Sequence, residues 1–193
     1  MKPSVNIHKE ILACEKLLEE LAKSANSDEF QDIWHRVLGH LERIWTKSVG
    51  YYKVSPKWSK WHQKEEAVRK ADPLLLYLTN ARGAYEHKAD DVTEKTGGGL
   101  AISAGSGKPV HIKKMTVSNG QVSGEWDGDL RVTFIPEKVD LKPVTNRGVL
   151  HKVPDIHLGK KLPSKDVIVV GQMGMKYYKD LIKRAEEFFA DKF

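Results

Sequence analysis

Cysteine and long apolar runs are both scarce in this sequence, and their scarcity excludes two classes of protein. Cys14 is the one cysteine, so no intramolecular disulfide can form. No apolar run approaches the roughly 18 residues that a membrane-spanning helix needs. The first residues, MKPSVNIHKEIL, are polar and contain no apolar stretch of signal-peptide length. We therefore expect a protein without a membrane segment that stays in the cytoplasm.

Motifs for metal and nucleotide binding are missing as well. The histidines form no HExxH motif, and His35 and His40 are too far out of phase to share a helix face. The sequence GSGKP at 105–109 lacks the first glycine and the Ser or Thr that complete a phosphate-binding P-loop. We accordingly predict no metal site and no cofactor.

The N-terminal part reads as a series of helices. Apolar residues recur at helical spacing over residues 5–23, and Asn26 with Glu29 resembles the capping box of a second helix. Residues 58–69 suit a short third helix. Asp72 followed by Pro73 predicts the start of a fourth helix, which runs through the sequence LLLYLTNARGAYEHKAD.

β signals dominate the segment that follows. The runs VHIKKMTV and QVSGEW flank Asn119-Gly120, which is a strong hairpin signal, and LRVTFIP is a third strand. The preceding Gly-rich sequence TGGGLAISAGSGKP is expected to be a loop or a loosely paired edge strand. The end of the chain returns to helical spacing, with apolar positions that include Val169, Tyr177 and Phe188.

The sequence therefore predicts an α+β fold with three parts. Residues 1–95 form an antiparallel helical bundle, residues 96–166 form a β-rich insertion or appended antiparallel sheet, and residues 167–193 form a C-terminal helix. The last helix packs on the bundle or on the sheet, and the sequence leaves both arrangements open.

One helix carries a pair of residues with catalytic chemistry. Arg82 precedes His87 by five positions, near the end of the fourth predicted helix. An imidazole titrates near neutral pH, and a guanidinium binds phosphate through a planar fork of donors. Here the chain resembles the HEPN superfamily, whose ribonuclease members carry an R-x4–6-H motif on a helix of a small bundle.

The resemblance implies metal-independent RNA cleavage by attack of the ribose 2′-hydroxyl on the adjacent phosphate, at a site where two protomers of a homodimer meet. It assigns proton transfer to His87 and phosphate stabilisation to Arg82, with Asn80 and Tyr85 as neighbours. HEPN ribonucleases usually place a polar residue, often Asn, directly after the arginine, whereas this sequence has Gly83. A purely structural interpretation also stands, in which Arg82 pairs with Glu86 one helical turn away.

A second feature is a basic and aromatic segment just before the motif helix. Residues 47–70 contain seven Lys or Arg residues and only two acids, Glu65 and Glu66. Lysines neutralise phosphates, and aromatic rings stack on unpaired bases. The residues that we predict to contact nucleic acid are Lys53, Lys57, Trp58, Lys60, Trp61 and Lys64. An apolar helix face flanked by extended lysines is the competing explanation.

The leading hypothesis is a HEPN-like protein that binds RNA or cleaves it without a metal, as a homodimer. The alternative is a non-catalytic module for dimerisation or protein interaction.

Overall fold

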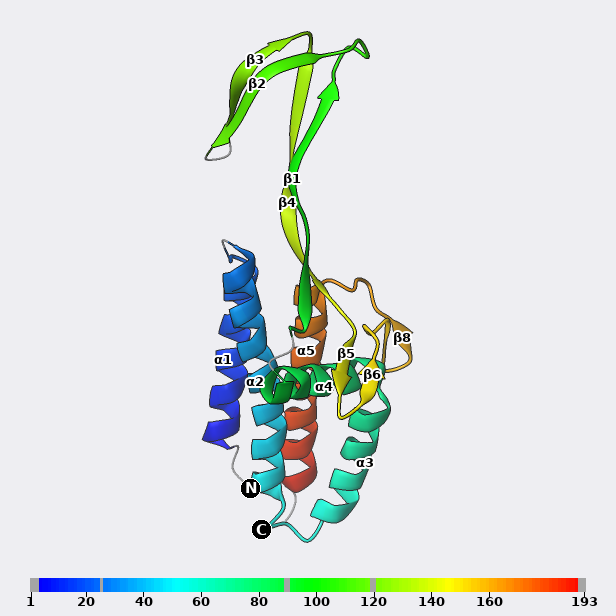
Figure 1. Cartoon of the computed structure of the whole chain (residues 1–193). Coiled ribbons are helices and arrows are strands. Elements are labelled where there is room, and N and C mark those ends of the chain that lie inside the picture. The colour runs from blue at the N-terminus through cyan, green and yellow to red at the C-terminus, as the bar shows by residue number, and fades with distance from the viewer. Residues whose placement is uncertain (1–3, 25, 89–90, 119–120, 191–193) are drawn as a thin grey trace. The chain divides into compact units, whose positions relative to one another are not determined.

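The computed structural model describes residues 4–24, 26–88, 91–118 and 121–190, and the fold is α+β as predicted (Figure 1). The helices are α1 (Val5–Leu21), α2 (Ser27–Tyr52), α3 (Trp58–Ala71), α4 (Pro73–Lys88) and α5 (Val167–Ala190). The Asn26 side chain accepts a hydrogen bond from Glu29 N and so caps α2. The expected helix starts at Trp58 and Pro73 are confirmed.

Within the described residues, the strands form four separate two-stranded sheets. The pairs are β1 (Thr93–Ala104) with β4 (Leu130–Leu141), β2 (His111–Ser118) with β3 (Gln121–Asp127), β5 (Val144–Asn146) with β6 (Val149–His151), and β7 (Ile156–His157) with β8 (Lys160–Lys161). The β2–β3 hairpin lies where the sequence predicts it, although Asn119 and Gly120 of its turn lie outside the described residues. Of the two alternatives for the Gly-rich segment, the strand is confirmed, because most of the segment forms β1, which among the described strands pairs with β4 alone.

Two compact units divide the chain, and they differ from the three predicted parts. The helical unit comprises the described residues of 1–94 and 139–193, and the ribbon unit comprises those of 95–138. The boundary predicted at residue 166 lies inside the helical unit, because β5, β6 and β7 all contact α4. The ribbon unit is thus an insertion within the helical unit.

The helical unit holds the hydrophobic core. In Figure 1, α1, α2 and α5 run side by side, while α4 contacts α2, α3 and α5. Most apolar positions expected in α1 and α2 are buried, including Ile7, Leu18 and Trp34. The expected stripe of α5 needs one correction at its end: Phe188 is 39% exposed, whereas Phe189 is 3% exposed and packs against Tyr52.

The small hairpins of the helical unit fix the position of α4. The Asp72 carboxylate accepts hydrogen bonds from Leu75 N at the start of α4 and from Leu158 N in the β7–β8 turn. His157 Nδ1 lies 2.9 Å from the same carboxylate, and because an ionised carboxylate only accepts, this nitrogen donates. Tyr77 Oη donates to Lys142 O, which joins the middle of α4 to the segment before β5. These bonds hold the helix that carries Arg82.

The residues described contain no helix that is both long enough and apolar enough to span a bilayer.

Candidate functional site

The Arg82–His87 motif lies in the last turns of α4. Arg82 is half-buried, and its guanidinium forms a bidentate pair with Glu86: Nε to Oε1 at 3.0 Å and Nη2 to Oε2 at 2.5 Å. This is the helix pair that the structural interpretation of the sequence predicts. His87 belongs to α4, but its side chain lies outside what the structure describes, so the predicted pairing of Arg82 with His87 stays a prediction.

Gly83 is buried against strand β5. A Cβ atom at this position would lie 2.6 Å from Asn146 Nδ2, which donates a hydrogen bond of 3.0 Å to Asn80 Oδ1 on α4. A side chain at position 83 would therefore displace the Asn146 amide. The space beside residue 83 already contains an amide group, which Asn146 supplies. Asn80, expected as a neighbour of the motif, faces β5 through this bond.

Arg82 lines an open pocket between α2 and α4 with a volume of about 490 Å³. We call it the α2–α4 pocket. Its charged and titratable lining residues are Asp32, His35, Arg36, Arg43, Arg82 and Glu86. Three arginines against two carboxylates leave an excess of one positive charge when His35 is neutral. A phosphate or a carboxylate fits this charge balance better than a cation does.

His35 is the residue of this pocket that sequence reasoning missed. Its ring stacks on Tyr85 of α4, with ring centroids 3.5 Å apart and 18° between the planes. Both ring nitrogens are buried, and neither has a hydrogen-bond partner among the described residues. Burial lowers the pKa of His35 below its ordinary value, against the opposing effect of Asp32 and Asp91. The imidazole is therefore mainly neutral near pH 7.

The positions of residues along α2 indicate that His35 shares a helix face with other residues of the pocket. His35, Gly39 and Arg43 are four residues apart and share one face of the helix, and all three line the α2–α4 pocket. The sequence alone does not reveal that α4 packs beside this face. His40 has another role, because its Nδ1 lies 2.7 Å from Glu10 of α1.

The predicted nucleic-acid surface is divided between solvent and core. Lys53, Lys57, Lys60 and Lys64 are exposed, and the last three lie on one side of α3 and the turn before it. Trp58 is half-buried and contacts the His62 ring at 4.6 Å between centroids. We call the four lysines and Trp58 the basic α3 surface.

Trp61 does not belong to the basic α3 surface. It is 5% exposed and packs against Tyr52 and Phe189, with centroid separations of 6.1 and 5.6 Å. A base cannot stack on a ring whose faces are covered by the core. The alternative interpretation, a helix face that is apolar inside and flanked by lysines, describes Trp61 correctly.

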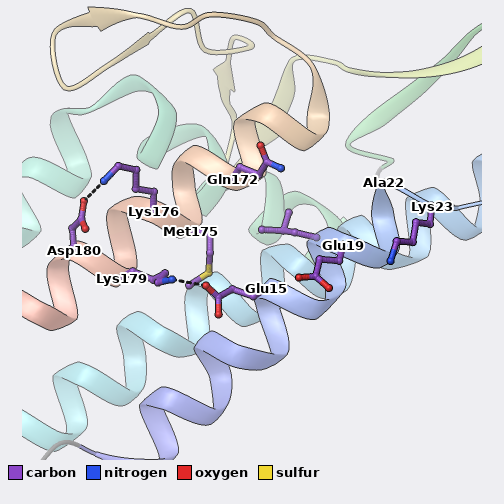
Figure 2. Close-up of a pocket in the computed structure, with 10 residues that line it drawn as sticks. Glu15, Glu19, Ala22, Lys23, Gln172, Met175, Lys176, Lys179 and Asp180 are labelled. Atoms are coloured by element: carbon purple, nitrogen blue, oxygen red, sulfur yellow. Dashed lines mark hydrogen bonds and ion pairs between the residues drawn. The ribbon is translucent and has the colours of Figure 1, made fainter.

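A larger pocket of about 750 Å³ lies between α1 and α5 (Figure 2). Figure 2 shows Lys179 reaching Glu15 and Lys176 turned toward Asp180, with N–O distances of 2.5 and 2.8 Å. Its lining contains three acids and three lysines, so it carries no net charge. No part of the predicted site lies in this pocket.

In the part of the chain that the structure describes, no three His, Cys, Asp or Glu side chains come together as a metal site would require. In comparisons with known proteins, no family model, no curated protein and no solved structure matches this chain.

Proposed function

We propose that the protein binds single-stranded RNA and acts as a HEPN-like, metal-independent endoribonuclease whose active residues are Arg82 and His87. The observation that carries this proposal is the set of arginines in the α2–α4 pocket, which Arg82 of α4 lines together with two arginines of α2. Clustered arginines recognise phosphate through paired, charge-assisted hydrogen bonds. A phosphate of the RNA backbone is the group that such a pocket would bind.

The Arg82–Glu86 pair is compatible with this role. Both side chains are partly exposed, and an ion pair between residues one helical turn apart contributes only about 0.3–0.5 kcal/mol. Arg82 can exchange this partner for a phosphate at little cost, because a charge-assisted bond to phosphate replaces a bond of similar kind. Glu86 then competes with the substrate for Arg82.

The chemistry of the proposed reaction is an internal transfer. The ribose 2′-oxygen loses its proton and attacks the adjacent phosphorus, and the bond from phosphorus to the 5′-oxygen of the next nucleotide breaks. The products are a 2′,3′-cyclic phosphate and a 5′-hydroxyl. His87 would move the proton, and Arg82 would stabilise the charge on the phosphoryl oxygens. A homodimer would bring the two residues of different protomers together.

The basic α3 surface supports the RNA-binding part of this proposal. Lys60 and Lys64 are exposed and form no ion pair within the described residues. Exposed lysines such as Lys60 and Lys64 release counterions when a nucleic-acid backbone binds to them. This surface would bind the backbone of the RNA strand.

The experiment is incubation of the purified protein with mixed single-stranded RNA in EDTA, beside an Arg82→Ala/His87→Ala double variant. Cleavage by the native protein alone, with cyclic phosphate ends, is the expected result. Equal cleavage by the variant would indicate a contaminating nuclease and would refute the assignment, as would the absence of cleavage over a broad range of RNAs.

A second candidate function is a non-catalytic interaction module, and the ribbon unit favours it. None of the described residues of this unit is buried, and the register of β2 and β3 places apolar side chains on one face of the hairpin. They are Ile112, Met115, Val117, Val122 and Trp126. Isolated two-stranded hairpins are marginally stable in water, so a partner that covers this face would stabilise it.

Sedimentation of the native protein and of an Ile112→Ser/Val117→Ser variant tests this second candidate. A self-associating species that dissociates in the variant, together with no RNA cleavage by the native protein, would favour the interaction module over the nuclease.

A further inference from the structure

Among the described residues, one positive group of the α2–α4 pocket has no hydrogen-bond or ion-pair partner. Arg43 bonds to Glu10, and Arg82 bonds to Glu86. Arg36 is exposed at the same pocket and forms no hydrogen bond or ion pair within the described residues. An anion that enters the pocket meets a free guanidinium before any existing pair has to break.

His35 is the second unsatisfied group in the same pocket. A buried polar group without a hydrogen bond costs about 1–3 kcal/mol, so its retention calls for an explanation. Tyr85 covers the imidazole by stacking on it, and the Tyr85 ring is itself 37% exposed. Hydrogen bonds to an imidazole form in the plane of its ring, so a tilt of the His35 ring within this stack would bring one of its nitrogens to the pocket that His35 lines.

We propose that the α2–α4 pocket is a phosphate-binding site, in which Arg36 and Arg82 bind the phosphate oxygens and His35 donates a hydrogen bond to them. The geometry of the pocket supports the phosphate site. The identification of its ligand as a phosphate of an RNA strand rests on the proposed function. Arg36 and His35 thereby join Arg82 as residues that contact the ligand.

Binding of the phosphate is coupled to protonation of His35. The charged groups around this imidazole are Asp32 and Arg36 on α2, Arg82 and Glu86 on α4, and Asp91 after α4. Burial keeps the ring mainly neutral in the free protein. A nearby phosphate anion favours the imidazolium, so binding takes up a proton and the affinity rises as the pH falls.

The test is titration of the full-length protein with inorganic phosphate, followed through the histidine ring signals in NMR spectra at pH 6 and pH 8. A His35→Gln variant assigns the His35 signal by its loss. We expect this signal to shift saturably with phosphate. Because inorganic phosphate itself gains a proton between pH 8 and pH 6, the pH dependence is measured with dimethyl phosphate, which is a monoanion at both values. Its affinity should be higher at pH 6 for the native protein and not for His35→Gln. Arg36→Gln should weaken binding about tenfold, which corresponds to one lost charge-assisted interaction. Lys16→Gln, which removes an exposed charge of α1 outside the pocket, should change the affinity less than twofold.

Two outcomes would overturn the phosphate site: no saturable shift of the His35 signal, or equal weakening by Arg36→Gln and Lys16→Gln. The source of the phosphate is resolved by titration with one oligoribonucleotide in its 5′-phosphorylated and 5′-hydroxyl forms. Equal affinity identifies an internal phosphodiester, and binding of the phosphorylated form alone identifies a terminal phosphate monoester.

The phosphate site and the proposed nuclease can fail separately. RNA cleavage without a phosphate-dependent shift of His35 would refute the site and leave the nuclease. A saturable shift without RNA cleavage in EDTA would leave the site and refute the nuclease.

Discussion

Asn146 Nδ2 lies 2.6 Å from the point where a Cβ atom of residue 83 would be, so the Asn146 side chain of β5 would have to move if residue 83 of α4 had a side chain. An alanine in the interior of a helix is usually about 1 kcal/mol more stable than a glycine. Here the added methyl group would displace the Asn146 amide and break its bond to Asn80, which costs about 1 kcal/mol.

We predict that Gly83→Ala gives no stabilisation in the native chain but stabilises an Asn146→Ala background by about 1 kcal/mol. Urea denaturation of the four proteins of this cycle measures the free energies of unfolding. If Gly83→Ala had the same effect in both backgrounds, the contact between these residues would not account for the glycine.

The Asp72 carboxylate should contribute more to stability than an ordinary helix cap. It accepts bonds from Leu75 N, Leu158 N and His157, and its side chain is buried. Asp72→Ala should cost about 3 kcal/mol, because Leu75 N, Leu158 N and His157 would each lose a hydrogen bond worth about 1 kcal/mol. Asp166 is the matched control: it caps α5 through Ile168 N, and its replacement by alanine should cost about 1 kcal/mol. If chemical denaturation showed the same loss in free energy of unfolding for both variants, the hydrogen bonds of Asp72 would not stabilise the contact between α4 and the β7–β8 hairpin.

The cluster around Glu10 predicts a specific loss of stability in acid. Burial alone would raise the pKa of Glu10, but hydrogen bonds from Lys47, Arg43 and His40 outweigh it and lower this pKa from 4.5 to about 2. A carboxyl group whose pKa is lower in the folded than in the unfolded protein stabilises the fold at pH values above its unfolded pKa. This stabilisation is lost as the pH falls toward its folded pKa.

We therefore expect the free energy of unfolding to fall between about pH 4.5 and pH 2, and to fall less in Glu10→Gln over the same range. Denaturation curves at pH 6, 4 and 3 measure the difference between the two proteins. Parallel pH profiles would show that Glu10 is not held as an ionised carboxylate.

The basic α3 surface should appear in the salt dependence of RNA binding. Each phosphate that a lysine neutralises adds about 0.7 to the slope of log affinity against log salt for a single strand. Lys60→Gln and Lys64→Gln should each lower this slope by about 0.7, whereas Lys16→Gln on α1 should leave it unchanged. A slope that responds equally to all three substitutions would indicate non-specific attraction to the whole basic chain.

Much of the fold can be predicted from the sequence, because the relevant signals are local. The cap of α2 at Asn26, the start of α4 at Pro73 and the β2–β3 hairpin each depend on residues within a few positions of one another. The division into units could not be predicted in the same way. It depends on the contact of β5, β6 and β7 with α4, and the residues involved are far apart in sequence.

The site illustrates the same limit. The Arg82–Glu86 pair was predictable, because both residues lie on one helix at a fixed spacing. The partners of Gly83 and His35 could not be predicted, because Asn146 and Tyr85 come from other elements of the fold. Trp61 was assigned to the surface because a helix pattern alone does not show which of two neighbouring tryptophans faces α5; its contact with Phe189 places it in the core.

The central claim is that Arg82 binds an RNA phosphate for which Glu86 competes. The most direct measurement is the affinity of a fluorescent single-stranded RNA for the native protein, Arg82→Gln and Glu86→Gln, determined by anisotropy at one salt concentration. We expect changes of opposite sign: about tenfold weaker binding for Arg82→Gln and tighter binding for Glu86→Gln. Unchanged affinity in both variants, or a change in the same direction, would contradict the claim and leave Arg82–Glu86 as an ordinary helix pair.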